Sequence, residues 1–488
     1  MSQPLLDAGT WTSKVFLDGW VDGAGGDRAV VSPSTGVEIG RVGLADEADV
    51  RRAAARAAAA QREWAAVPHV ERAAVLRRAG DLFTQHEQEI SDWLIREGGA
   101  IGGRAHFETA TAAQECYEAA ALVSMPYGEL LRSTQERLSF SRRLPVGVVG
   151  VIAPFNVPIV LSIRAVAPAL ALGNAVVLKP DPRTAVCGGV VLARVFEQAG
   201  LPQGLLSVLP GGVDVGEALV RDEAIRVIAF TGSTAAGRSV AALAAQHLKR
   251  VHLELGGNSA LIVLDDVDLE AAASVGSWGS FFNQGQVCMT TGRHVVHARV
   301  AEEYADRLAA HADKLPVGDP STGEVALGPL IDAAQRDKVH RIVQQTVAAG
   351  ARLAAGGTYD GLFYRPTVLA QTPPDSPAFA QEVFGPVAPI VSFSDLDEAV
   401  ALAGSGEYGL SLGILTRDVM KGLDLAARVP TGLVHINDQT INDEANIPFG
   451  GFGASGTGSR HGGHAANVEA FTETQWVTLR GELPAYPF

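Results

Sequence analysis

The cysteine at position 288 is the residue whose setting most clearly suggests chemistry. It ends the segment FNQGQVC, residues 282–288, directly after a Gly-Gln turn. Backbone amides of such a turn are expected to lower the pKa of the thiol, and a thiolate is a strong nucleophile toward a carbonyl carbon. Cys116 and Cys187 lie in helical apolar stretches, where a cysteine behaves as a small core residue. The sequence therefore predicts one nucleophilic thiol, Cys288.

Two further residues could act on a carbonyl bound at that thiol. Glu254 ends an apolar strand and precedes two glycines, a setting that suits a partly buried general base. Asn156 stands between Pro154 and Pro158 just past a strand, and such rigid placement suits an oxyanion donor, which must be fixed before charge develops. Structural alternatives are a glutamate satisfied by backbone amides and an ordinary turn.

Three other segments suit a dinucleotide. Lys179 ends a strand, where open α/β sheets bind ligands and a lysine can donate to ribose or phosphate. Residues 230–237, FTGSTAAG, join a strand to a helix whose first amides can hold a pyrophosphate. Glu382 and Phe384 precede a Gly-Pro turn and could clamp a ribose and a flat ring. Each segment alone also fits a structural role, as a surface charge, a capped turn or a closed loop.

The rest of the pattern predicts the elements that position these residues. An amphipathic helix is expected over residues 75–94, with a stop at Gly98-Gly99. Short β-branched runs follow at 146–153, 175–178, 205–209, 225–230, 251–255 and 260–264. Candidate helices alternate with them at 162–172, 184–199, 216–220 and 234–247. This alternation predicts a doubly wound parallel α/β sheet. A second α/β segment, 269–415, precedes a glycine-rich stretch, 448–463, that we expect neighbours to order.

Composition excludes several classes of protein. The 488 residues suggest about three domain equivalents, and 47% hydrophobic with 19% charged residues argues against disorder. A net charge of −15 disfavours binding to nucleic acid or to a membrane surface. No run of 18 apolar residues and no secretory leader pattern is visible, so we expect a cytoplasmic protein. Three cysteines without metal-ligand spacing fit a reducing compartment, and we predict no metal site.

Taken together, in this order and spacing, the six segments resemble the aldehyde dehydrogenase superfamily. The Glu-Leu-Gly-Gly motif begins at Glu254 and the Gly-Gln-x-Cys motif ends at Cys288, so the glutamate and the cysteine are 34 positions apart. The resemblance implies an α/β fold with a Rossmann-like cofactor domain, an α/β catalytic domain and a small β oligomerisation element. The implied ranges are 1–127 with 144–253 for the first, 254–470 for the second, and 128–143 with 471–488 for the third. It also implies a homodimer or a homotetramer.

The resemblance also assigns catalytic roles. Cys288 attacks the aldehyde, and the Asn156 amide and the Cys288 backbone N–H hold the resulting oxyanion. A hydride is transferred from the former aldehyde carbon to a nicotinamide, and a thioester remains on Cys288. Glu254 then activates the water that releases the acid.

Cofactor contacts follow from the same resemblance. Lys179 matches the contact to the adenosine ribose, and Ser233 with Gly232 matches the pyrophosphate turn. Glu382 and Phe384 match the residues that fix the nicotinamide ribose and ring. NAD is the expected cofactor.

Within the superfamily, the chain most resembles benzaldehyde and vanillin dehydrogenases. Three stretches carry this resemblance, at residues 94–97, 179–187 and 441–456. An aromatic substrate needs a flat apolar slot. The residues expected to line it are Phe155, Val287, Met289 and Phe449, for which ordinary packing around the catalytic loop is the alternative.

One departure concerns the cofactor. Many NAD-preferring members carry a glutamate three positions after the lysine, where it would repel a 2′-phosphate. Here Pro182 stands at that position and Arg183 follows, so NADP is expected to be accepted beside NAD. Other activities left open are an aliphatic or semialdehyde dehydrogenase and a CoA-acylating one, against which the retained Glu254 argues. A purely structural protein would require a lost active site, whereas all three catalytic residues are present.

Overall fold

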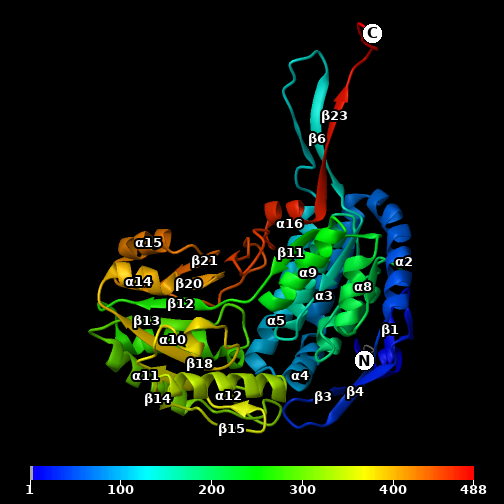
Figure 1. Cartoon of the computed structure of the whole chain (residues 1–488). Coiled ribbons are helices and arrows are strands. Elements are labelled where there is room, and N and C mark those ends of the chain that lie inside the picture. Colours follow the sequence, from blue (N-terminus) through cyan, green and yellow to red (C-terminus); the bar gives the residue numbers. More distant parts are fainter. Residues whose placement is uncertain (1–3) are drawn as a thin grey trace.

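Residues 4–488 are described by a computed structural model. Two seven-stranded sheets form the body of the molecule, and a narrow three-stranded arm projects from it (Figure 1). The first three residues of the predicted cofactor domain lie outside the described residues. Between residues 4 and 488, no helix combines the length and apolar character needed to cross a bilayer.

The first sheet has the strand order β11-β10-β7-β8-β9-β1-β2. Strands β7 to β11 run parallel, and two antiparallel strands close one edge. Their bounds are β1 (Lys14–Phe16), β2 (Trp20–Asp22), β7 (Val148–Ile152), β8 (Ala175–Lys179), β9 (Leu206–Val208), β10 (Ile225–Thr231) and β11 (Arg250–Glu254). Every residue of β7 and β8 is buried, as expected of parallel strands with helices on both faces.

Helices cover both faces of this sheet. One group is α2 (Glu47–Ala66), α8 (Val213–Arg221) and α9 (Thr234–Gln246). The other is α6 (Pro158–Ala171), the π-helical turn η1 (Val186–Val190) and α7 (Val191–Gln198), with α3 (His69–Gln85), α4 (Glu87–Gly98) and α5 (Gly102–Leu122) packed behind. All residues of α6 are buried, so this helix lies at the centre of the unit.

Two predicted helices are interrupted. The helix expected over 75–94 is two helices, because the chain breaks at His86, which ends α3 and precedes α4. The helix expected over 184–199 begins as the π turn η1. There the buried Glu97 carboxylate accepts the backbone N–H groups of Val186 (2.9 Å) and Cys187 (2.7 Å), which ties α4 to this turn.

The second sheet has the order β14-β17-β18-β13-β12-β20-β21 and is parallel except for β14. Its strands are β12 (Ser259–Val263), β13 (Thr291–His297), β14 (Arg352–Ala355), β17 (Thr367–Ala370), β18 (Val387–Phe393), β20 (Ser411–Leu415) and β21 (Leu433–Ile436). The helices around it are α10 (Leu269–Phe281), α11 (Ala301–Lys314), α12 (Ala333–Ala348), α13 (Pro377–Ala380), α14 (Leu396–Ala403) and α15 (Val419–Arg428). The short 3₁₀ turn η2 (Phe282–Gly285) follows α10.

The arm contains β5 (Gly128–Leu130), β6 (Leu138–Pro145) and β23 (Thr472–Leu479), in the order β23-β6-β5. Strand β23 pairs antiparallel with the whole of β6, although the two lie far apart in the sequence (Figure 1). The remaining elements are α1 (Ala8–Trp11), the hairpin β3 (Asp27–Val31) and β4 (Glu38–Gly43), β15 (Tyr359–Asp360), β16 (Phe363–Tyr364), β19 (Tyr408–Gly409), β22 (Phe452–Gly453) and α16 (His464–Phe471).

The glycine-rich stretch returns to the first sheet. The Leu255 N–H donates to the Ser455 carbonyl at 3.0 Å, and Glu254 forms a bridge with Gly456. This late segment therefore holds the end of β11, where the first sheet stops. The predicted domain boundary at residue 254 coincides with that end, and the assignment of the two units to cofactor and substrate stays a prediction.

Candidate active site

The three predicted catalytic residues come from three loops or strand ends. Asn156 lies between β7 and α6, Glu254 ends β11, and Cys288 lies between η2 and β13. The buried Asn156 amide donates from Nδ2 to the Gln286 carbonyl at 3.0 Å. That bond joins the loop of the first sheet to a residue two positions before the thiol. The structure thus brings Asn156 to the Cys288 loop.

The Cys288 loop has an unusual backbone. Asn283, Gln284 and Gly285 all have positive φ, at 51°, 57° and 65°. A Cβ at Gly285 would lie 2.1 Å from the Gly385 carbonyl oxygen, so this position requires glycine. The Asn283 amide braces the turn by donating to the Asn156 carbonyl at 3.2 Å and the Gln286 carbonyl at 3.3 Å. Side-chain bonds thus stabilise a loop conformation that L-residues rarely adopt.

The thiol itself is not acidified. Burial, followed by the charges of Glu382 and Glu254, raises the pKa of Cys288 to about 12, although the positive Arg164 acts in the opposite direction. The expectation that turn amides lower this pKa is therefore wrong, because burial and nearby carboxylates outweigh them. Cys288 keeps partial exposure, whereas Cys116 and Cys187 are buried. A base must therefore take the proton of this thiol before the sulfur can attack.

Glu254 is the nearby carboxyl group that has no partner of its own. The residue is 3% exposed, and neither Oε1 nor Oε2 has a hydrogen-bond partner within residues 4–488. Burial raises the pKa of Glu254 well above its usual range, and the charges of Arg164 and Arg460 only partly oppose this. An unpaired buried carboxyl group is costly to keep and is typical of functional sites.

Two predicted cofactor residues, Glu382 and Phe384, line a small cavity together with Val287, the residue before Cys288. The Glu382 Oε1 accepts the Gly257 N–H at 3.1 Å, and burial raises the pKa of this carboxyl to about 7. A Cβ at Gly256 would lie 2.5 Å from Glu382 Oε2, so the glycine pair after Glu254 leaves room for this carboxylate. Phe384 has a positive φ of 55°.

The other predicted cofactor residues lie along the edge of the first sheet. Lys179 is buried, which lowers its pKa, and within residues 4–488 the one hydrogen bond of its Nζ goes to the Pro180 carbonyl, at 3.5 Å. Gly232 and the exposed Ser233 follow β10, and the Ser233 hydroxyl caps α9 by accepting the Ala236 N–H at 3.3 Å. A buried, weakly bonded ammonium and an open helix start both fit an anionic dinucleotide.

The predicted substrate residues separate into two groups. Val287, Met289 and Phe449 belong to one buried cluster, with Cys288 packed against it. Phe155 lies apart, because its ring meets that of Phe384 edge to face, with centroids 6.0 Å apart. The structure therefore places Phe155 beside a predicted nicotinamide contact.

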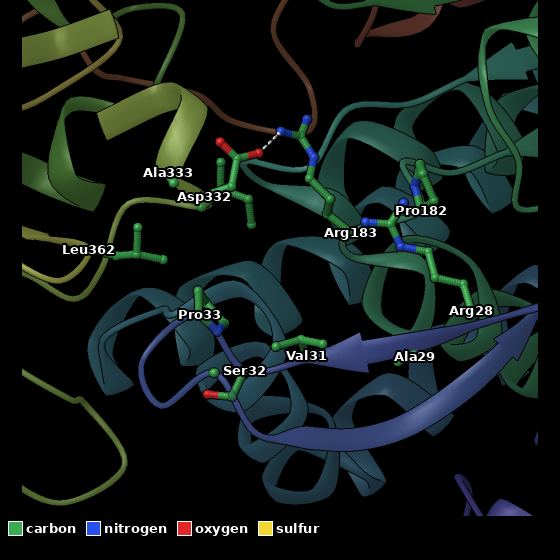
Figure 2. Close-up of a pocket in the computed structure, with 12 residues that line it drawn as sticks. Arg28, Ala29, Val31, Ser32, Pro33, Pro182, Arg183, Asp332, Ala333 and Leu362 are labelled. Atoms are coloured by element: carbon green, nitrogen blue, oxygen red, sulfur yellow. Dashed lines mark hydrogen bonds and ion pairs between the residues drawn. The ribbon is translucent and has the colours of Figure 1, made fainter. Parts of the chain in front are cut away.

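A cavity of about 310 Å³ lies between the β3–β4 hairpin, Pro182 with Arg183, and the start of α12 (Figure 2). Arg183 pairs with Asp181 at 2.8 Å and with Asp332 at 2.7 Å, and its guanidinium lies 4.3 Å from the Phe155 ring centre. The Arg183 guanidinium therefore already interacts with two carboxylates and one aromatic ring.

Known proteins match the chain along most of its length. Residues 20–477 match the aldehyde dehydrogenase family. The chain belongs to the aldehyde dehydrogenase family. The family and the α/β fold predicted from the sequence are therefore confirmed.

Three relatives of this aldehyde dehydrogenase are informative. It is 67% identical to a vanillin dehydrogenase from Amycolatopsis sp. (strain ATCC 39116 / 75iv2), over 99% of each chain. It is 50% identical to a benzaldehyde dehydrogenase [NAD(+)] from Pseudomonas putida, over 98% of each. Its fold matches the crystal structure of a salicylaldehyde dehydrogenase from Pseudomonas putida G7 complexed with salicylaldehyde, with a TM-score of 0.94 and 34% identity over 97% and 99% of the two chains.

Sequence reasoning missed the charged residues that support this dehydrogenase's site. Arg104 donates to the Asn156 carbonyl at 2.7 Å and pairs with Glu108, whose other oxygen accepts the Ile159 N–H at 2.7 Å. Arg164 lies on α6 with its guanidinium 4.9 Å from the Phe449 ring centre. An arginine inside the apolar stretch predicted at 162–172 was the available signal, since a buried charge needs a partner.

Proposed function

We propose that the protein oxidises an aromatic aldehyde to its carboxylic acid with a nicotinamide dinucleotide. The observation that carries this proposal is the Cys288 side chain packed against an apolar cluster that contains Phe449, with the charge of the unpaired Glu254 acting on its thiol. An aromatic ring suits such an apolar pocket. All three relatives described above are named for aromatic aldehydes.

Proton transfer precedes attack in the proposed mechanism. Because the thiol pKa is about 12, a base must remove its proton, and the unpaired Glu254, whose own pKa is raised, is the group that accepts it. The Cys288 sulfur then forms a bond to the aldehyde carbon. The oxyanion that develops is held by the second N–H of the Asn156 amide and by the Cys288 backbone N–H.

The second half of the mechanism is hydrolysis. A bound nicotinamide dinucleotide would supply the acceptor for the hydride of the former aldehyde carbon, and Cys288 would then carry an acyl group. Glu254 first releases the thiol proton to solvent and then removes a proton from water, and the hydroxide oxygen bonds to the acyl carbon. The C–S bond breaks, the carboxylate departs, and Cys288 regains a proton. Lys179, Ser233, Glu382 and Phe384 are the residues proposed to hold the dinucleotide.

NAD is the proposed cofactor, with NADP accepted more weakly. Pro182 removes a carboxylate that would repel a 2′-phosphate, which favours acceptance of NADP. Arg183, however, already pairs with Asp181 and Asp332, so it adds little attraction for that phosphate. The Pseudomonas putida relative named for NAD(+) supports this order of preference.

One assay tests substrate and cofactor together. Purified full-length protein is mixed with benzaldehyde, hydroxylated benzaldehydes, cinnamaldehyde or a linear aldehyde, each with NAD and with NADP and without CoA. The proposal expects the highest kcat/KM for an aromatic aldehyde with NAD, and formation of the free acid. A linear aldehyde as the best substrate, a requirement for CoA, or a preference for NADP would each contradict the corresponding part.

We propose that the arm joins copies of this chain into a homodimer or homotetramer. Its strands expose large apolar side chains, including Leu130 at 77% and Trp476 at 61%, which marks an interaction surface. A solution mass of one 50.9 kDa chain by light scattering would contradict this. A cytoplasmic location stays a prediction from composition, and detection of the protein in secreted or membrane fractions would oppose it.

A further inference from the structure

The cavity between the β3–β4 hairpin and the start of α12 has no part in the proposed reaction. Its volume of about 310 Å³ lies within the range of small-molecule sites. Its lining, drawn from residues 4–488, includes none of the residues predicted for catalysis, for cofactor binding or for the substrate pocket. Pro182 and Arg183 reach it from the loop that follows Lys179. The cavity is therefore distinct from the candidate active site.

Apolar side chains form much of the cavity wall. They come from the first unit on one side and from the second unit on the other (Figure 2), and they are Val31, Pro33, Pro182, Ile331 and Leu362. Val31 is 44% exposed, so a ligand in the cavity can cover apolar surface that now faces water. A ligand of this cavity therefore needs an apolar body.

Arg28 is the cation of the lining that lacks an ionic partner. Its side chain is exposed, and it takes part in none of the ion pairs found among residues 4–488. The acidic residues of the two hairpin strands, Asp27 and Glu38, pair instead with Arg41 at 2.6 and 3.1 Å. Figure 2 shows the Arg28 side chain extending from β3 toward Arg183. A guanidinium of this kind can bind a carboxylate through two parallel hydrogen bonds.

The other charged groups of the lining are already paired. Arg183 binds Asp181 at 2.8 Å and Asp332 at 2.7 Å. Asp332 also caps α12, since its Oδ1 accepts the Gln335 N–H at 2.8 Å. These charges offset one another, and Arg28 therefore determines that the ligand is an anion.

We propose that this cavity is a second binding site, whose ligand is an aromatic carboxylic acid of the class that the proposed reaction releases. The carboxylate pairs with Arg28, and the ring lies against the apolar wall at Val31 and Pro33. The choice of an aromatic acid rests on the proposed function. The anion site itself rests only on the cavity and on Arg28.

Photoaffinity labelling locates such a ligand. The full-length protein is irradiated with 4-azidobenzoate, without aldehyde, in the absence and in the presence of saturating NAD, and mass spectrometry identifies the labelled peptides. We expect label within residues 28–36, 182–183, 331–333 or at 362, which line the cavity. Excess benzoate should remove this label. The uncharged 4-azidobenzamide, which has nearly the same shape, should give about threefold less label or lower, because it lacks the carboxylate.

Two results would overturn the second site. Label confined to the peptides that contain Phe155, Cys288 or Phe449 would place the acid in the candidate active site alone. Loss of the cavity label when NAD is added would show that the cavity belongs to the cofactor site.

A variant then tests the anchor. Arg28→Gln should raise the benzoate concentration that halves the cavity label by about threefold to tenfold, as expected for the loss of a partly exposed charge-assisted pair. Arg62→Gln is the matched control, since Arg62 is an exposed arginine of α2 outside the cavity lining, and it should match the wild type. Equal values in all three proteins would contradict the role of Arg28 and the choice of a carboxylate.

Labelling requires no turnover, so its outcome is separate from that of the proposed function. A labelled cavity in a protein that oxidises no aromatic aldehyde would contradict the proposed function and leave the anion site standing. Oxidation of an aromatic aldehyde by a protein whose cavity takes no label would contradict only the second site.

Discussion

Two buried glutamates, Glu108 and Glu254, differ in whether their carboxylate oxygens have hydrogen-bond partners. Glu108, on α5, has a partner for each oxygen, the Arg104 guanidinium and the Ile159 N–H of α6. Glu254, at the end of β11, has none within residues 4–488. Burial raises the pKa of both. The first carboxylate holds the Asn156 loop in place, and the second is left free to exchange a proton.

Two of the cysteines, Cys187 and Cys288, differ in a similar way in their burial and backbone conformation. Cys187 is buried within η1, whose amides are bound by Glu97. Cys288 is partly exposed in a loop with positive φ values. Glu108 and Cys187 belong to the parts that stabilise the fold, whereas Glu254 and Cys288 lie where chemistry is proposed.

Replacement of the nucleophile should have the largest effect. We expect Cys288→Ala to lower kcat/KM for the best aldehyde by about 10⁴-fold or more, because no other group can form the acyl intermediate. Steady-state NAD reduction measures it. Cys187→Ala is the matched control and should stay within about threefold of the wild type. Comparable losses in the two variants would remove the distinction between the thiols.

The next largest effect concerns the unpaired carboxyl group. Glu254→Gln should lower kcat by about 10²–10⁴-fold, since it removes the proposed base. In the wild type, activity should rise with pH as Glu254 loses its proton, and the raised pKa places this rise above pH 4.5. The variant should lack that rise. A pH–rate profile that keeps the same ascending limb in Glu254→Gln would show that another group is the base.

The paired carboxylate should matter for stability instead. Glu108→Gln leaves the buried Arg104 without its charged partner, and we expect a loss of about 3–5 kcal/mol in the free energy of unfolding. Chemical denaturation gives this value. A loss below about 1 kcal/mol would mean that the ion pair does not hold the α5–α6 region.

The smallest effect is the pH dependence of stability. Because the pKa of Glu254 is raised in the folded protein, the folded state holds the proton more tightly, and stability falls as pH rises above 4.5, by at most about 1.4 kcal/mol per pH unit. Glu254→Gln should lack this contribution, so its thermal midpoint should gain on the wild type from pH 5 to pH 8. A constant difference would contradict the raised pKa.

The sequence predicts the parts of this molecule that depend on local pattern. The parallel strands β7, β8 and β10 follow from β-branched runs between helical segments, and Cys288 follows from its turn. The break at His86 and the π turn at Val186 were missed, and the π turn depends on a tertiary contact, the Glu97 carboxylate.

Pairings between distant segments could not be predicted. Arg164 and Asp443 are 279 positions apart in sequence, and no local signal connects them. The pKa of Cys288 likewise depends on burial and on Glu382, which the second sheet brings to it. A single segment of sequence therefore indicates the candidate reactive atoms but not the charges that surround them.

The return of the glycine-rich stretch to β11 has a consequence for how the protein is made. All strands of both seven-stranded sheets lie before or at Ile436 in the sequence. The segments that complete the structure come later, since Glu254 forms its bridge with Gly456 and β6 pairs with β23. A ribosome delivers these late segments last, and contacts of such sequence separation form slowly. A nascent chain can thus build its scaffold while the strand end that carries its proposed base is still unsupported, and activity is the last property it acquires.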